Sequence, residues 1–147
     1  MNVQIEQAEI KDLEDIFEIE NASFATPMAR ESLVEDLSSV DNTYYILAKL
    51  MGKTVGFAGI RLMYDHADVI SIAVLDSYRG KHIGAALLEA LNVKCIALDF
   101  EKIFLEVRVS NAVAISLYRQ AGYVDISIRK EYYTDNLEDA LIMMKEI

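Results

Sequence analysis

The sequence is poor in the residues that build disulfide scaffolds and metal clusters. Its 147 residues include one cysteine, two histidines, one proline and no tryptophan. One cysteine cannot form an internal disulfide, and Cys95 lies on an apolar helical stripe where a core residue is expected. Asp65, His66 and Asp68 have metal-binding chemistry, but no further ligand cluster accompanies them, and His66 is expected in an exposed loop. We therefore expect a protein of the reducing cytoplasm that binds no metal.

Long apolar runs and a leader segment are also missing from the sequence. No apolar run approaches the ~20 residues that a membrane helix needs, and residues 1–6 have neither a basic nor an apolar stretch. Hydrophobic residues make up 53% and charged residues 26%, the composition of a folded domain rather than of a disordered or membrane protein. The length predicts a single soluble domain over residues 1–147, with no membrane partner.

Basic residues are scarce relative to acidic ones. Fourteen Lys and Arg residues stand against 24 Asp and Glu residues, which gives a formal net charge of −10. Such a charge repels nucleic-acid phosphates, so no direct nucleic-acid partner is expected, and it favours cationic partners. Acidity that serves only solubility explains the same composition equally well.

The hydrophobic pattern predicts a mixed α/β fold around one sheet. Apolar residues recur every three or four positions from Ile83 to Leu98, which indicates a long helix, and residues 51–53 (Met-Gly-Lys) are typical of a hairpin turn. The expected strands are Val3–Gln7, Tyr44–Lys49, Thr54–Leu62, Val69–Val74, Ile103–Val107, Tyr123–Arg129 and Ala140–Lys145. The expected helices are Ile10–Glu20, Arg30–Leu37, His82–Leu98 and Ala112–Gln120.

A glycine-containing segment joins the strand Val69–Val74 to the long helix. Arg79, Gly80 and Gly84 lie where that helix begins. Free backbone N–H groups and the helix dipole at such a turn suit a pyrophosphate, and glycine permits its close approach. The spacing matches neither the dinucleotide fingerprint nor the Walker A loop. Taken alone, the segment favours an ordinary helix start over a phosphate site.

A second segment of interest follows the strand Ile103–Val107. Asn111 is suited to cap the next helix and Gly122 to end it. Glu106 lies between two apolar residues of the strand, so its pattern alone indicates a solvent-facing side chain. Tyr118 lies two turns along the helix from Asn111, and its pattern alone indicates a core aromatic.

Together, the two segments resemble the GCN5-related N-acetyltransferase (GNAT) family. Residues Arg79–Gly84 (RGKHIG) are similar to its Arg/Gln-x-x-Gly-x-Gly/Ala pyrophosphate loop, and Asn111–Tyr123 (NAVAISLYRQAGY) are similar to its second motif. The sequence is closer still to the RimI-type branch, which acetylates the N-terminal alanine of a small-subunit ribosomal protein. The segments that carry this closer likeness are Leu105–Arg108, Ser110-Asn111, Tyr132-Tyr133, Glu138–Ala140 and Met143.

The resemblance implies a GNAT fold, with a mixed sheet splayed near its middle to admit acetyl-CoA. It implies that Glu106 is the general base and that Tyr118 is the general acid toward the departing thiolate. Tyr132 and Tyr133 would line the entrance for the acceptor, a basic protein or peptide N-terminus that belongs to a ribosomal protein. The residues implied to hold acetyl-CoA are Ile72, Ala73, Val74, Arg79, Gly80, Lys81, His82, Ile83, Gly84, Ala85 and Asn111.

The sequence departs from the family pattern at two places. His82 stands where the loop has its central glycine, so a positive φ there would strain a residue with a Cβ. Residues 26–29 resemble the Pro-Trp-Ser element of the branch but lack its Trp and Ser, and this loop borders the acceptor site. Two other functions therefore stay open: an acetyltransferase for a polyamine or amino sugar, and a non-catalytic acyl-CoA-binding regulator.

Overall fold

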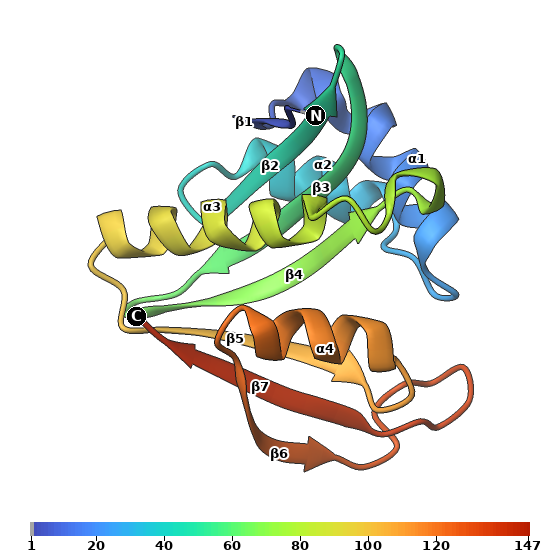
Figure 1. Ribbon diagram of the computed structural model, residues 1–147, viewed down its shortest axis with the longest axis vertical. Helices are drawn as coiled ribbons and strands as arrows, with labels where there is room; N and C mark the ends of the chain where they lie inside the picture. Colours follow the sequence, from blue (N-terminus) through green and yellow to red (C-terminus); the bar gives the residue numbers. More distant parts are fainter. Residues whose placement is uncertain (1) are drawn as a thin grey trace.

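A computed structural model of the protein describes residues 2–147, which form one seven-stranded sheet with α-helices on both faces (Figure 1). The first half contains β1 (Gln4–Gln7), α1 (Leu13–Ser23), α2 (Arg30–Ser38), β2 (Thr43–Leu50), β3 (Lys53–Leu62) and β4 (His66–Val74). The second half contains α3 (Ile83–Ala97), β5 (Lys102–Arg108), α4 (Ala112–Gln120), β6 (Val124–Arg129) and β7 (Ala140–Glu146). Each predicted helix and strand is present. Among the helices of residues 2–147, none is both long and apolar enough to cross a membrane.

The strands lie in the order β1-β2-β3-β4-β5-β7-β6. All neighbours are antiparallel except β4 and β5, which are parallel and connected through α3, because parallel strands need a long crossover. Met51 and Gly52 join β2 to β3 with φ values of 50° and 81°, the left-handed pair of a two-residue hairpin turn. The predicted mixed α/β fold and the predicted hairpin are therefore confirmed.

Helices cover the two faces of the sheet unequally. In Figure 1, α3 and α4 lie in front of the sheet, and α1 and α2 lie behind its β2–β4 part. The larger core cluster lies between the sheet and α3 with α4, and it includes the fully buried Cys95, as predicted. The smaller cluster packs α1 and α2 on the opposite face of β2–β4.

The alternation along β5 decides which face carries the candidate base. Ile103, Leu105 and Val107 are buried in the core cluster with α3 and α4. Successive strand residues point to opposite faces, so Glu106 points away from these two helices. This second face of β5 lies beyond the strands on which α1 and α2 pack.

Candidate active site

The sheet opens between β4 and β5. Residues 66–68 of β4 are paired with residues 102–104 of β5, and beyond them the two strands diverge (Figure 1). β4 stays paired with β3 as far as Val74. In the described part of the chain, the edge of Ile72–Val74 that faces β5 therefore has no strand partner, and its backbone groups can bind a ligand. The predicted splay of the sheet is confirmed.

The loop before α3 has the backbone geometry of an anion site. Gly80 and His82 have φ values of 77° and 63°, both in the left-handed region. His82 is the N-cap of α3, but its side chain makes no capping hydrogen bond, so the first N–H groups of the helix stay free. A Cβ on Gly80 would meet no atom within 4 Å. Position 82, where the family loop has its central glycine, thus has a positive φ, and this conformation costs His82 about 1–2 kcal/mol.

The side chains of this loop differ in how freely they can contact a ligand. Arg79 Nε donates to the Val74 carbonyl at 3.1 Å, and its Nη1 pairs with Asp76 at 2.7 Å. Arg79 must leave both partners before it can contact a ligand. Lys81 lies with its Nζ 5.9 Å from the ring centroid of Tyr78, at the surface. Ile83 is buried in the core, so only its backbone can contact a ligand.

Gly84 marks the point where α3 touches α4. A Cβ built on Gly84 would lie 2.9 Å from Leu117 Cδ2, which is closer than two carbon atoms can pack. The sequence pattern indicates that Gly84 allows a pyrophosphate to approach the backbone closely. The structure adds a second requirement, which is close helix packing.

Gly84→Ala is therefore expected to destabilise the protein by about 1 kcal/mol, because the end of the Leu117 side chain can shift and alanine favours the helix over glycine. Thermal unfolding measures the loss. Adding Leu117→Ala should recover part of it by removing the clashing methyl groups, and the single Leu117→Ala variant closes the double-mutant cycle. An unchanged melting temperature in Gly84→Ala would contradict the packing explanation.

Glu106 lies at one end of a groove of about 700 Å³ that β4, β5 and β6 help to line. Its side chain is 33% exposed, and Oε1 lies 3.4 Å from Nη1 of Arg129 on β6. Tyr132 lines the same groove, and its interaction with the Glu106 carboxylate is the main reason why the pKa of Tyr132 is raised. The carboxylate is thus reachable from the groove and is paired with Arg129. Arg129 was not predicted as a site residue, because its strand lies two positions from β5 in the sheet and no local pattern marks the pairing.

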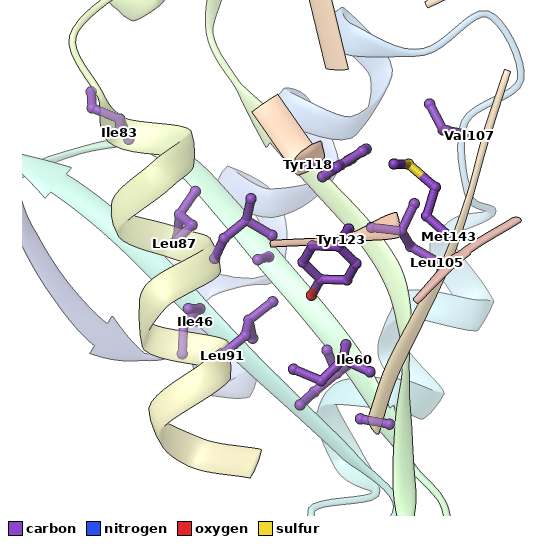
Figure 2. Close-up of a cluster of buried hydrophobic side chains, with 14 of the residues drawn as sticks. Ile46, Ile60, Ile83, Leu87, Leu91, Leu105, Val107, Tyr118, Tyr123 and Met143 are labelled. Carbon is purple, nitrogen blue, oxygen red and sulfur yellow. The ribbon is translucent and has the colours of Figure 1, made fainter. Parts of the chain in front are cut away.

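Tyr118 approaches β5 from the other face. It is 7% exposed, and its ring packs edge-on against Tyr123 with 6.0 Å between centroids. Figure 2 shows both rings between side chains of α3 and side chains of β5 and β7. Burial raises the pKa of Tyr118 well above its ordinary value. The phenol therefore stays protonated at neutral pH and can act as a hydrogen-bond donor.

Tyr133 lies close to Glu106 and Tyr118. It belongs to the loop between β6 and β7, where its ring packs edge-on against Tyr132 at 5.1 Å. Burial raises the pKa of Tyr133 to about 12, while the Arg108 guanidinium opposes the rise and the Glu106 carboxylate adds to it. The guanidinium of Arg108, the last residue of β5, lies 4.0 Å from the Tyr133 ring centroid. The fold thus brings this loop to the same end of β5 as Glu106 and Tyr118.

Asn111 is the N-cap of α4. Its Oδ1 accepts a hydrogen bond from the Ala114 N–H at 3.2 Å, so the predicted capping role is confirmed. The side chain is exposed, and its NH₂ group remains a donor for a ligand. Contact with the cofactor stays a prediction.

The expectation that His66 lies in an exposed loop is wrong. His66 begins β4 and is half-buried, with its ring 5.3 Å from that of Phe104 and Nδ1 2.9 Å from Asp65 Oδ1. Strand β4 starts three residues before its apolar run does, because residues 66–68 pair with β5, and Ala67 and Asp68 also pair with β3. Backbone pairing thus extends the strand through His66 and Asp68, whose polar side chains give no hydrophobic signal.

Known proteins share this fold and align with most of this chain at 32–37% sequence identity. The model of the Acetyltransferase (GNAT) family matches residues 10–123. A protein of Bacillus subtilis (strain 168) is 37% identical over 134 residues, which are 91% of this chain and 89% of that protein. The ribosomal protein bS18-alanine N-acetyltransferase of Escherichia coli (strain K12) is 33% identical over 141 residues, with 95% of this chain and 94% of that protein covered.

A solved structure agrees along the whole chain. The crystal structure of the ribosomal-protein-S18-alanine N-acetyltransferase from Escherichia coli superposes with a TM-score of 0.92 at 32% sequence identity. The match covers 99% of this chain and 94% of that one. Since the family match spans most of the chain and these relatives align with nearly all of it, the chain belongs to the acetyltransferase (GNAT) family and is an acyltransferase enzyme.

Proposed function

We propose that residues 1–147 are one N-acetyltransferase domain that moves the acetyl group of acetyl-CoA onto the N-terminal amine of a protein. The proposed acceptor is the N-terminal alanine of a cytoplasmic small-subunit ribosomal protein, since the Escherichia coli relative is named for bS18-alanine acetylation. One structural observation carries the proposal. Glu106 and Tyr118 lie on opposite faces of β5, beyond the point where β4 diverges from it.

The chain has a fitting site for acetyl-CoA. The free edge of Ile72–Val74 offers N–H and C=O groups to the two amides of a pantetheine arm, as an added strand would use them. The uncapped start of α3 and the open space at Gly80 suit a pyrophosphate. The thioester supplies an acetyl group that is already activated. We assign the donor to Ile72, Ala73, Val74, Arg79, Gly80, Lys81, His82, Ile83, Gly84, Ala85 and Asn111.

The transfer forms a C–N bond and breaks the thioester C–S bond, so one proton must leave the amine and the sulfur must be stabilised as a leaving group. Glu106 accepts the proton of the amine, directly or through an ordered water, because its carboxylate faces the groove. Tyr118 donates its phenolic hydrogen toward the sulfur from the opposite face, because burial keeps that group protonated. Neither role needs a covalent link to the enzyme.

An α-amine suits this arrangement better than a lysine side chain. Its pKa of about 7.7–8.0 lies far below the value of about 10.4 for lysine, so a single carboxylate suffices as base near neutral pH. The net charge of −10 also favours a basic chain as acceptor through its long-range field. Tyr132 and Tyr133 lie beside Glu106 and are assigned to the acceptor entrance.

The loop that departs from the family pattern is anchored close to the proposed donor site. The backbone N–H of Met28 donates to Oε2 of the buried Glu20 at 2.8 Å. Oε1 of Glu20 accepts from the Ser71 hydroxyl at 2.7 Å, and Ser71 precedes Ile72 on β4. The loop between α1 and α2 is therefore held next to the β4 edge. This position supports the assignment of the loop to the acceptor site.

A panel of acceptors tests the proposal. With purified enzyme and acetyl-CoA, a basic peptide that begins with alanine should gain one acetyl group at its N-terminus, as read by mass spectrometry. The same peptide with a blocked N-terminus and free lysines should stay unmodified. Faster turnover of a polyamine or amino sugar would contradict the protein acceptor, and acetyl-CoA binding without any turnover would indicate a regulator instead. Ribosomal proteins from cells with and without the enzyme identify the natural acceptor.

A further inference from the structure

Arg108, the last residue of β5, is the centre of a charged cluster that the proposed reaction does not use. It follows Glu106 by two positions, so both side chains leave the strand on the same face. Its Nη2 donates to both carboxylate oxygens of Asp135 at 3.0 Å. Its Nη1 lies 3.4 Å from Glu138 Oε1 and 3.2 Å from Asn136 Oδ1. The three partners belong to the loop between β6 and β7, so one side chain holds this loop at three points.

The same guanidinium also lies on the ring of Tyr133, 4.0 Å from its centroid. This is a favourable cation–π contact with a half-buried ring. Tyr133 packs edge-on against Tyr132, and the Tyr132 ring lies 5.8 Å from the guanidinium of Arg129, which pairs with Glu106. The positions of both loop tyrosines beside the candidate base therefore depend on Arg108.

Glu138 connects the cluster to α4. Its Oε2 accepts a hydrogen bond from the backbone N–H of Ser110 at 2.8 Å, and Ser110 precedes Asn111, the N-cap of the helix that carries Tyr118. Contact with Ser110, followed by contact with Arg108, holds the pKa of Glu138 below its usual value. Figure 1 shows the loop at the end of the sheet where β5 ends and α4 begins. Strand, helix and loop thus meet at the pair of Arg108 and Glu138.

The contacts of Arg108 itself lie apart from most residues assigned to the donor, and the contact next to Asn111 is made by Glu138. The side-chain partners of Arg108 lie within residues 133–138, whereas the proposed donor site uses mainly the β4 edge and the loop before α3. Loss of the Arg108 contacts should therefore free the loop without changing the binding of acetyl-CoA.

We propose that Arg108 is a positioning residue for the acceptor. It closes the loop of residues 130–139 onto β5, so that Tyr132 and Tyr133 form a preset wall beside Glu106. The inference rests on the proposed function, because it takes the Glu106 face as the acceptor side. Arginine suits this role better than lysine, since its planar fork bonds several acceptors and stacks flat on a ring.

The test compares Arg108→Gln and Arg108→Lys with Arg119→Gln as a matched control. Arg119 lies on α4 and pairs with Asp125 at 2.7 Å, so its replacement removes the same charge and one ion pair outside the loop. Arg108→Gln should raise KM for the acceptor about tenfold or more, because the acceptor wall loses its geometry. The acetyl-CoA affinity, measured by calorimetry, should stay at the wild-type value. Arg108→Lys should give an intermediate KM, and the control should match the wild type.

Hydrogen exchange gives a readout that does not depend on activity. Backbone amides of residues 130–139 should exchange faster in Arg108→Gln and keep their wild-type rates in Arg119→Gln. Asp135→Asn should also raise KM for the acceptor and speed up exchange in the loop. Both changes should be smaller than in Arg108→Gln, because Asp135 lies on the exposed side of the cluster. The role of Arg108 is overturned if Arg108→Gln leaves KM for the acceptor or the exchange rates of the loop unchanged. It is also overturned if the affinity for acetyl-CoA falls together with the affinity for the acceptor. If the enzyme prefers a polyamine, the proposed function with a protein acceptor is wrong. The role of Arg108 is then decided by KM for that amine and by the exchange rates of the loop.

Discussion

Replacing Tyr118 with phenylalanine is expected to lower kcat by about 10²–10⁴-fold, the usual contribution of a general acid or base. The ring should keep its packing against Tyr123 and the core, because only the hydroxyl is removed. Burial raises the pKa of this phenol, so the wild-type group carries its proton at any pH where the enzyme works. Single-turnover rates measure the loss of the chemical step, and thermal unfolding checks that the fold survives.

Tyr123 offers a matched control in the same core. It is also a buried tyrosine whose pKa is raised by burial, and its ring is 6.0 Å from that of Tyr118. Tyr123→Phe should keep kcat near the wild-type value, since no part of the reaction is assigned to its hydroxyl. Equal losses in the two variants would mean that Tyr118 acts through core packing and that another group stabilises the departing sulfur.

Glu106→Gln is expected to lower kcat/KM for the acceptor by about 10²–10⁴-fold. The amide has nearly the same shape as the carboxylate but cannot accept a proton as a base. The affinity for acetyl-CoA should stay nearly intact, because Glu106 belongs neither to the β4 edge nor to the loop before α3. Steady-state kinetics with the acceptor peptide and calorimetry with acetyl-CoA separate the two effects.

A second carboxylate on the same sheet controls for net charge. Glu146 lies on β7 opposite Lys102, at the far end of β5 from Arg108, and it is exposed. Glu146→Gln removes the same charge and should leave the rate unchanged. Wild-type rates in Glu106→Gln, under conditions where chemistry limits turnover, would show that the amine loses its proton to solvent before it binds.

Local signals predicted most of the elements that build the site. The apolar stripe of α3, the turn at Met51 and Gly52 and the cap at Asn111 each depend on neighbouring residues, so the sequence alone was sufficient for them. The start of β4 was missed, because His66 and Asp68 are polar and join the strand only through pairing with the neighbouring strands. The roles assigned to the site residues stay predictions for the kinetic tests above.

Short segments thus determined where a helix or strand begins, which loop has free N–H groups and which residue types are available for proton transfer. Tertiary structure decided how these parts face one another. Glu106 and Tyr118 are twelve positions apart in the chain, but the alternation of β5 and the packing of α4 put them on opposite faces of one strand. Arg129 meets Glu106, and Arg108 meets the tyrosine loop, because the sheet order β5-β7-β6 brings distant segments together. Such long-range pairing is set by core packing and backbone hydrogen bonding across the sheet, and it leaves no pattern in the local sequence.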